Sequence, residues 1–139
     1  MIYVIGSLRN PRIPEISEEL RRRLHEDVFD DWFAVGPHAD DAWRDYERAR
    51  GHDLVEALRG RAARHTFEFD LRHLIDASTV VLVLPAGKSA HLELGFAVGK
   101  RKTTAVLLDD DPERYDVMYQ FADVVANNIP DLVRGLGGR

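Results

Sequence analysis

Short apolar runs alternate with amphipathic stretches in the first part of the chain. Residues 3–5 form an apolar run that ends at Gly6, and apolar side chains recur at helical spacing over residues 16–24. Val28-Phe29 predicts a second short strand, which leads into a long polar loop with a turn-prone Asp40-Asp41. The chain is therefore expected to open with a strand, a helix and a strand.

A longer helical stretch and a fully apolar strand are predicted in the middle of the chain. Helical character resumes at about Trp43, is interrupted at Gly51 and Gly60, and continues to about Ile75. Residues 80–84 form an uninterrupted run of valine and leucine, which is typical of strands that helices cover on both faces. This run predicts a strand of a parallel sheet.

The remaining elements continue the alternation of strand and helix. A loop over residues 86–89 leads into a helix that contains Glu93, residues 103–108 predict the next strand, and Val124-Val125 predicts a fifth. These elements predict an α/β fold, a doubly wound, flavodoxin-like parallel sheet of five strands with helices on both faces. Ligands of such sheets bind beyond the carboxyl ends of the strands.

Composition and charge narrow the classes of function. The 139 residues fit one domain, residues 1–139, and no apolar run is long enough to cross a bilayer. The net charge of -5 disfavours a nucleic-acid polymer as partner, because such binding needs a basic surface. The chain has no cysteine, which excludes thiolate nucleophiles and Cys-bound zinc. Its first residues lack the features of a signal peptide, so we expect a cytoplasmic protein.

Glu93 draws attention because it follows a loop at a strand end and has apolar neighbours. The sequence places this carboxylate near the start of a helix, beside Leu92, Leu94 and Phe96. An acid there can complement the helix dipole, or can cap the helix if residue 90 is the N-cap. With residue 89 as the N-cap, Glu93 falls one position late for a capping box. The alternative interpretation is a catalytic group at a strand end.

Asp70 is a second carboxylate in an apolar setting. It lies three residues after Phe67 and four before Leu74, within the apolar stripe of the predicted helix that also contains Leu71. A buried acid needs a partner or a shifted pKa, so Asp70 belongs either to a structural hydrogen-bond network or to a site. Two carboxyls from different helices suit glycoside chemistry, in which a nucleophilic carboxylate works with a second carboxyl about 5 Å away.

The loop after the first strand is a candidate anion site. Gly6 permits close approach of the backbone, Ser7 offers a hydroxyl, and Arg9 offers a guanidinium that binds phosphate or carboxylate through two hydrogen bonds. A plain strand-to-helix turn with an arginine in solvent explains these residues equally well. The six histidines lack metal-ligand spacing, so we expect no metal and no cofactor.

Four blocks of the sequence carry a family resemblance. They are residues 2–9, residues 69–82 from Phe-Asp to Val-Val-Leu, residues 89–97 with Glu-Leu-Gly-Phe-Ala at their end, and residues 116–118, Asp-Val-Met. Together they span most of the chain, and the Glu-Leu-Gly-Phe-Ala block is the most specific. The chain resembles the nucleoside 2-deoxyribosyltransferase family and its relatives, the 2'-deoxynucleoside 5'-phosphate N-hydrolases.

The resemblance implies roles for individual residues. Glu93 matches the glutamate that attacks the anomeric carbon, and Asp70 matches the aspartate that positions the sugar or assists protonation of the leaving base. Asp116 and Met118 match a late segment that, in family dimers, reaches the site of the neighbouring subunit. The transferases usually carry an acid for base recognition at the position of Gly87, which this chain lacks.

The resemblance also bears on the substrate. Gly6, Ser7, Arg9 and Ser89 are similar to the phosphate-contacting positions of the N-hydrolase branch, which favours a 5'-phosphorylated substrate. We expect cleavage of the N-glycosidic bond of a (2-deoxy)nucleoside or its 5'-monophosphate, with transfer to another base or to water. The expected partners are these small molecules and further copies of the chain, in a homodimer or higher homo-oligomer with shared active sites. Neither a nucleic-acid polymer nor a membrane is expected as a partner.

Two other functions compete with this prediction. A non-catalytic nucleotide sensor on the same fold would use Arg9 and Ser89 for binding alone. A phospho-acceptor receiver domain needs acids after its first strand and at the end of its central strand, where this chain has Gly6 and Pro85. The receiver domain is therefore discarded, and the sensor stays as the alternative.

Overall fold

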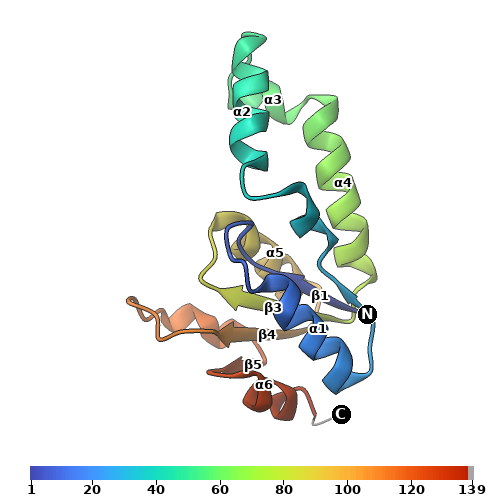
Figure 1. The fold of residues 1–139 in the computed structure, drawn as a ribbon, viewed down its shortest axis with the longest axis vertical. Helices are drawn as coiled ribbons and strands as arrows, with labels where there is room; N and C mark the ends of the chain where they lie inside the picture. The colour runs from blue at the N-terminus through green and yellow to red at the C-terminus, as the bar shows by residue number, and fades with distance from the viewer. Residues whose placement is uncertain (138–139) are drawn as a thin grey trace.

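A five-stranded, all-parallel sheet forms the centre of the protein (Figure 1). The computed structural model describes residues 1–137, and its strand order is β2-β1-β3-β4-β5. This is the order of flavodoxin-like doubly wound folds, so the predicted fold class is confirmed. The strands are β1 (Ile2–Ile5), β2 (Val28–Phe29), β3 (Thr79–Leu84), β4 (Thr103–Leu108) and β5 (Val124–Ala126).

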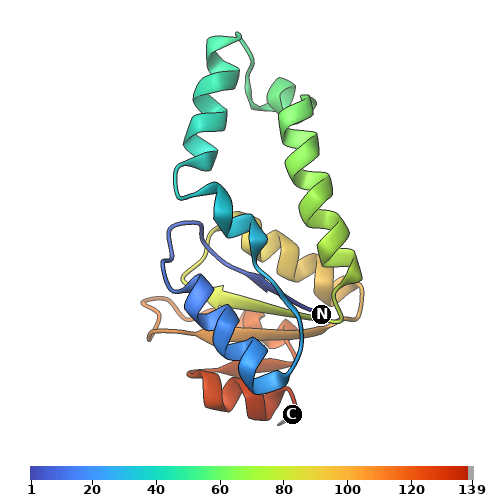
Figure 2. The same cartoon turned by 45° about the vertical axis from the view of Figure 1, so that its right-hand side comes forward.

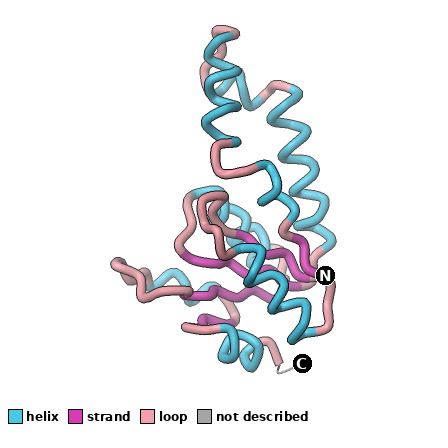
Figure 3. Tube along the Cα trace, in the orientation of Figure 1, coloured by secondary structure: helices cyan, strands magenta, loops and turns pink. Residues whose placement is uncertain are grey.

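Helices cover both faces of the sheet (Figure 3). Successive side chains of a strand point to opposite faces, so Ile2 and Val4 of β1 pack with one set of helices and Tyr3 and Ile5 with the other. The first face is covered by α1 (Ile13–Leu24) and α6 (Ile129–Gly135), and the second by α5 (Lys88–Gly99) and the last turns of α4 (Arg61–Asp76). Both layers exclude water from the sheet, which explains its continuous apolar strands.

The strands β1 and β3 form the point at which the strand order changes direction. They are neighbours in the sheet, with Ile5 opposite Leu82. The chain leaves β1 toward α1 on one face and leaves β3 toward α5 on the other face. The loops that follow these two strands therefore diverge at the carboxyl edge, where doubly wound folds bind their ligands.

A helical arm, residues 31–76, projects away from the sheet between β2 and β3 (Figure 2). It comprises the 3-10 helix η1 (Asp31–Val35), α2 (Ala39–Ala49), α3 (Leu54–Leu58) and α4. The helix interruptions predicted at Gly51 and Gly60 are confirmed. The predicted long polar loop is wrong at its end, because α2 begins at Ala39 and Asp40-Asp41 lie in its first turn. Acidic side chains there complement the positive end of the helix dipole.

Few side chains of the arm are buried. Leu74 is the single buried residue of α4, and Glu47 is the single buried residue of α2. Phe67, which the sequence places on the same apolar stripe as Leu74, is 64% exposed. The stripe is thus buried only at the base of α4, because its outer turns extend beyond the sheet (Figure 1). Within residues 1–137, no helix has the length and apolar character that a bilayer crossing requires.

Candidate active site

Glu93 lies in the second turn of α5. The helix begins at Lys88 after its N-cap, Gly87, so Ser89 belongs to the first turn and not to the preceding loop. Neither of the N-caps considered from the sequence, residues 89 and 90, is correct. Glu93 is too far from the N-cap for a capping box or for a strong interaction with the helix dipole. The capping explanation is therefore wrong, and the position of Glu93 must be explained by its contacts.

The Glu93 carboxyl meets Tyr3 from β1 and Asp70 from α4. Burial raises the pKa of Glu93 to about 7, while the Tyr3 hydroxyl lowers this pKa and the charge of Asp70 raises it. Burial also raises the pKa of Asp70, and the neighbouring His73 opposes that rise. The two carboxyls that the sequence singled out are therefore close enough for their charges to interact, although they come from different helices.

Within residues 1–137 no ion pair involves this carboxyl pair, although His73 acts on Asp70 strongly enough to oppose the rise in its pKa. Among residues 1–137, no arginine, lysine or histidine forms an ion pair with Glu93 or Asp70. The same part of the chain has no group of three or more acidic, histidine or cysteine side chains that could hold a metal ion. An acid removed from water without a compensating charge destabilises the fold, and such acids are typical of functional sites.

Tyr3 is the site residue that the sequence did not reveal. It is fully buried in β1, and its ring lies 4.9 Å from that of Phe29, which stacks on His73 at 4.0 Å. Within residues 1–137 its hydroxyl has no partner at ordinary hydrogen-bond geometry, yet it is close enough to Glu93 to lower the pKa of that carboxyl. Burial, and then the charges of Glu93 and Asp70, raise the pKa of Tyr3, so the phenol stays protonated.

The loop after β1 makes a tight turn with its own polar groups. The Arg9 backbone N–H donates to Ser7 Oγ at 3.1 Å, and the Arg9 guanidinium lies 3.4 Å from the Asp41 carboxylate of α2. A Cβ atom on Gly6 would lie 2.8 Å from Ile13 Cδ1. Close packing of α1 therefore explains this glycine without a ligand. Arg9 and Ser89 are both exposed, and their contact with a phosphate stays a prediction.

Asp116 and Met118 belong to a segment that packs against α5, the helix that carries Glu93. Asp116 caps the 3-10 helix η2 (Val117–Phe121) by accepting the Met118 N–H at 2.8 Å. The Tyr119 hydroxyl lies 3.0 Å from His91 Nε2, which holds η2 against α5. In residues 1–137, no hydrogen bond or ion pair joins Asp116 or Met118 to the carboxyl pair. Met118 is instead exposed.

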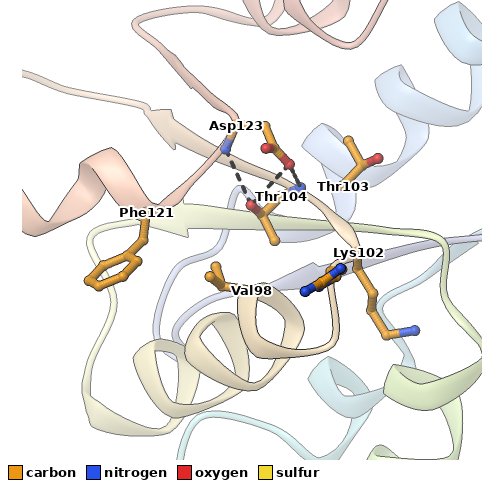
Figure 4. Close-up of a pocket in the computed structure, with 7 residues that line it drawn as sticks. Val98, Lys102, Thr103, Thr104, Phe121 and Asp123 are labelled. Carbon is orange, nitrogen blue, oxygen red and sulfur yellow. Dashed lines mark hydrogen bonds between the residues drawn. The ribbon is translucent and has the colours of Figure 1, made fainter.

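A hollow of about 490 Å³ lies at the opposite edge of the sheet, where β4 begins (Figure 4). Lys102 and Asp123, which line it, already have partners. Lys102 Nζ donates to the carbonyl oxygens of Ile75 and Ala77 at 2.7 and 2.6 Å, and the Asp123 carboxylate accepts the Thr104 N–H at 2.8 Å. These bonds join the ends of neighbouring elements, so a structural role accounts for the polar groups of this hollow.

Comparison with known proteins does not add to these observations. No protein-family model matches the chain, and no curated protein matches it. The function is therefore inferred from the geometry around Glu93 and from the residues themselves.

The variant Glu93→Gln is expected to stabilise the folded protein at pH 8. Folding raises the pKa of Glu93 from 4.5 to about 7, so the folded state binds this proton more tightly than the unfolded state. Stability is therefore lost as the pH rises through this window, and an uncharged glutamine avoids that loss. The expected gain in the free energy of unfolding is on the order of 1–3 kcal/mol at pH 8 and close to zero at pH 4.

Urea denaturation at the two pH values measures this difference. The matched control is Glu68→Gln, because Glu68 is an exposed acid on α4 and its replacement should change little at either pH. A Glu93→Gln protein that is less stable than the parent at pH 8 would contradict the placement of this carboxyl.

Proposed function

We propose that the protein cleaves the N-glycosidic bond of a (2-deoxy)nucleoside or its 5'-monophosphate through a glycosyl-enzyme on Glu93. The observation that carries the proposal is the approach of Glu93 to Asp70 and to the buried Tyr3 hydroxyl, with no ion pair to either carboxyl within residues 1–137. Retaining glycoside cleavage uses a nucleophilic carboxylate beside a second carboxyl. The resemblance of residues 93–97 to the nucleoside 2-deoxyribosyltransferase family supports the choice of substrate.

The proposed reaction has two steps. In the first, an oxygen of the ionised Glu93 bonds to the anomeric carbon, and the bond from that carbon to the base nitrogen breaks with its electron pair leaving on the base. Asp70 positions the sugar or assists protonation of the leaving base, and burial raises the pKa of this acid. In the second step, water or another base attacks the anomeric carbon and frees Glu93. Hydrolysis and transfer differ only in this acceptor.

Tyr3 acts in this scheme on the ionisation of the nucleophile. Glu93 attacks only as a carboxylate, and burial holds its pKa at about 7. The Tyr3 hydroxyl stabilises the carboxylate and so lowers that pKa, whereas the charge of Asp70 raises it. The carboxylate also stabilises the positive charge that develops on the sugar as the base departs. Burial, which is the largest of these effects, places the pKa of Glu93 at about 7 and so makes the site sensitive to pH near neutrality.

A 5'-phosphate is proposed to bind at the carboxyl edge between Arg9 and Ser89. The exposed pair of Arg9 with Asp41 is a weak interaction, so the guanidinium can exchange that partner for a phosphate. Ser89 lies in the first turn of α5, which has no side-chain cap, and free backbone N–H groups at such a helix start attract anions. The phosphate would then orient the sugar with its anomeric carbon toward Glu93.

The protein is further proposed to work in the cytoplasm as a homodimer or higher homo-oligomer with shared active sites. The exposure of Met118 supports this view, as does the lack, within residues 1–137, of a hydrogen bond or ion pair from Asp116 or Met118 to the carboxyl pair. In the family that the sequence resembles, the matching segment serves the neighbouring subunit.

The variant Glu93→Ala should lose base release by at least about a thousandfold, because it removes the nucleophile. The assay follows free base by chromatography after incubation with a deoxynucleoside or its 5'-monophosphate, each with and without an acceptor base. Glu68→Ala, an exposed acid on α4, is the matched control and should keep full activity. Unchanged turnover in Glu93→Ala would rule out the assignment. A parent protein that retains nucleotide but releases no base would favour the sensor.

Replacing Arg9 with alanine is expected to remove the preference for a 5'-monophosphate. The ratio of kcat/KM for the nucleotide to that for the nucleoside should fall by about tenfold or more, since a charged hydrogen-bond partner of the phosphate is lost. Activity on the nucleoside should stay unchanged, because Arg9 is not part of the carboxyl pair. Equal losses on both substrates would contradict the anion site.

The pH profile of kcat/KM should rise through about pH 7, because Glu93 must be ionised. Tyr3→Phe removes the hydroxyl that lowers the pKa of Glu93, so this rising limb should move to higher pH. Asp70→Asn removes the charge that raises the same pKa, so the limb should move to lower pH. Shifts of the two variants in the same direction would argue against Glu93 as the titrating group.

A further inference from the structure

We propose that the outer end of the arm binds an acidic surface loop of a second copy of this chain. The arm tip is defined as residues 48–64, and the acidic loop as residues 109–121. A two-fold pair of chains would form this contact twice, with each arm tip on the loop of the other chain. The inference rests on the homo-oligomer of the proposed function and deepens it by naming the two contact surfaces, but it does not depend on glycosidic activity.

The arm helices have little to pack against in their own chain. Each of α2 and α4 has one buried residue, and the one in α2 is the acid Glu47. Isolated helices of this length are marginal in water, and most helix stability in proteins comes from the packing of an apolar face. The arm nevertheless leaves large apolar side chains exposed, namely Tyr46, Leu54, Val55, Leu58 and Phe67. A surface of this kind is typical of a protein interface.

The arm tip is also basic. Four exposed arginines, Arg48, Arg59, Arg61 and Arg64, have no carboxylate partner within residues 1–137. The acids of this region are already engaged. Glu47 is buried, and its carboxylate lies 2.6 Å from His52 Nδ1. Asp53 and Glu56 cap α3, because the side chain of each accepts the backbone N–H of the other. The arm tip therefore presents positive charge next to exposed leucine and valine.

The acidic loop has the complementary chemistry. Asp110, Asp111, Glu113 and Asp116 are all exposed, and none of them forms an ion pair within residues 1–137. Tyr115 in the same loop is 83% exposed, and Val117, Met118 and Phe121 are exposed beside it. Negative charge and apolar side chains thus occur together here, as positive charge and apolar side chains do at the arm tip.

The two surfaces do not meet within one chain. In Figures 1 and 2 the arm tip and the acidic loop project from different sides of the body. Opposite charges on two surfaces guide and orient their association. Because the basic arm tip and the acidic loop belong to the same chain, a second copy of the chain is the partner that matches both. The contact would also bring the loop that carries Asp116 and Met118 onto the helix of the second copy that carries Asp70.

The experiment is a pair of charge reversals. The arm variant carries Arg59→Glu and Arg61→Glu, and the loop variant carries Asp110→Arg and Glu113→Arg. Sedimentation velocity and native mass spectrometry follow the assembly, with the parent protein expected at twice the 15.8 kDa of one chain. Each variant alone should dissociate at least about tenfold more readily than the parent, because like charges then face each other. An equimolar mixture should form a heterodimer, since both of its contacts regain opposite charges.

The matched control carries Arg22→Glu and Arg134→Glu, two exposed arginines on the helices of the other sheet face, and should assemble like the parent. Circular dichroism confirms that every variant is folded. Recovery of the heterodimer on mixing supports the proposal. A parent that is monomeric at all concentrations, an assembly that survives both reversals, or a mixture that stays monomeric would each overturn it. Because the readout is mass, this result is independent of whether the protein releases a base.

Discussion

The partly buried carboxyl of Glu93, which has no ion-pair partner within residues 1–137, is the constraint on which the rest of this structure depends. The sheet supplies Tyr3, the arm supplies Asp70 and α5 supplies Glu93, so three separate elements must hold their places for the three groups to meet. Apolar packing on both sheet faces provides that support. At the base of the arm, Trp32 Nε1 donates to the Val4 carbonyl oxygen at 2.7 Å and ties η1 to β1. The stability of the body thus offsets the unfavourable partial burial of Glu93 and Asp70.

Much of the fold could be predicted because its strands are apolar runs with clear limits. The run that became β3 ends at Pro85, and its lack of alternation indicates helices on both faces. The start of α2 was harder, because Asp40-Asp41 suits a turn and equally suits the first turn of a helix. The exposure of Phe67 could not be foreseen. Periodicity shows which side chains share a helix face, but it does not show how far a sheet extends beneath that face.

The sequence indicated those residues of the candidate site whose polar side chains have apolar neighbours. Glu93 and Asp70 are carboxyls among apolar neighbours, and that contrast is visible in the sequence. Tyr3 could not be identified in this way, because a tyrosine in an aliphatic strand can be a core residue as readily as a site residue. Its only signal is the need of a buried hydroxyl for a polar neighbour. The spacing of residues along one chain does not encode proximity to a site in another copy, so the roles of Asp116 and Met118 stay a proposal.

The shallow anchoring of α4 links order in the arm to proton binding at Glu93. Leu74 is the only buried residue of that helix, and Asp70 lies one turn farther out. Opening the outer arm therefore requires less free energy than opening the sheet. When α4 is in place, the charge of Asp70 raises the affinity of Glu93 for a proton. By reciprocity, a proton on Glu93 favours the ordered arm, so the order of α4 and the ionisation of Glu93 are coupled.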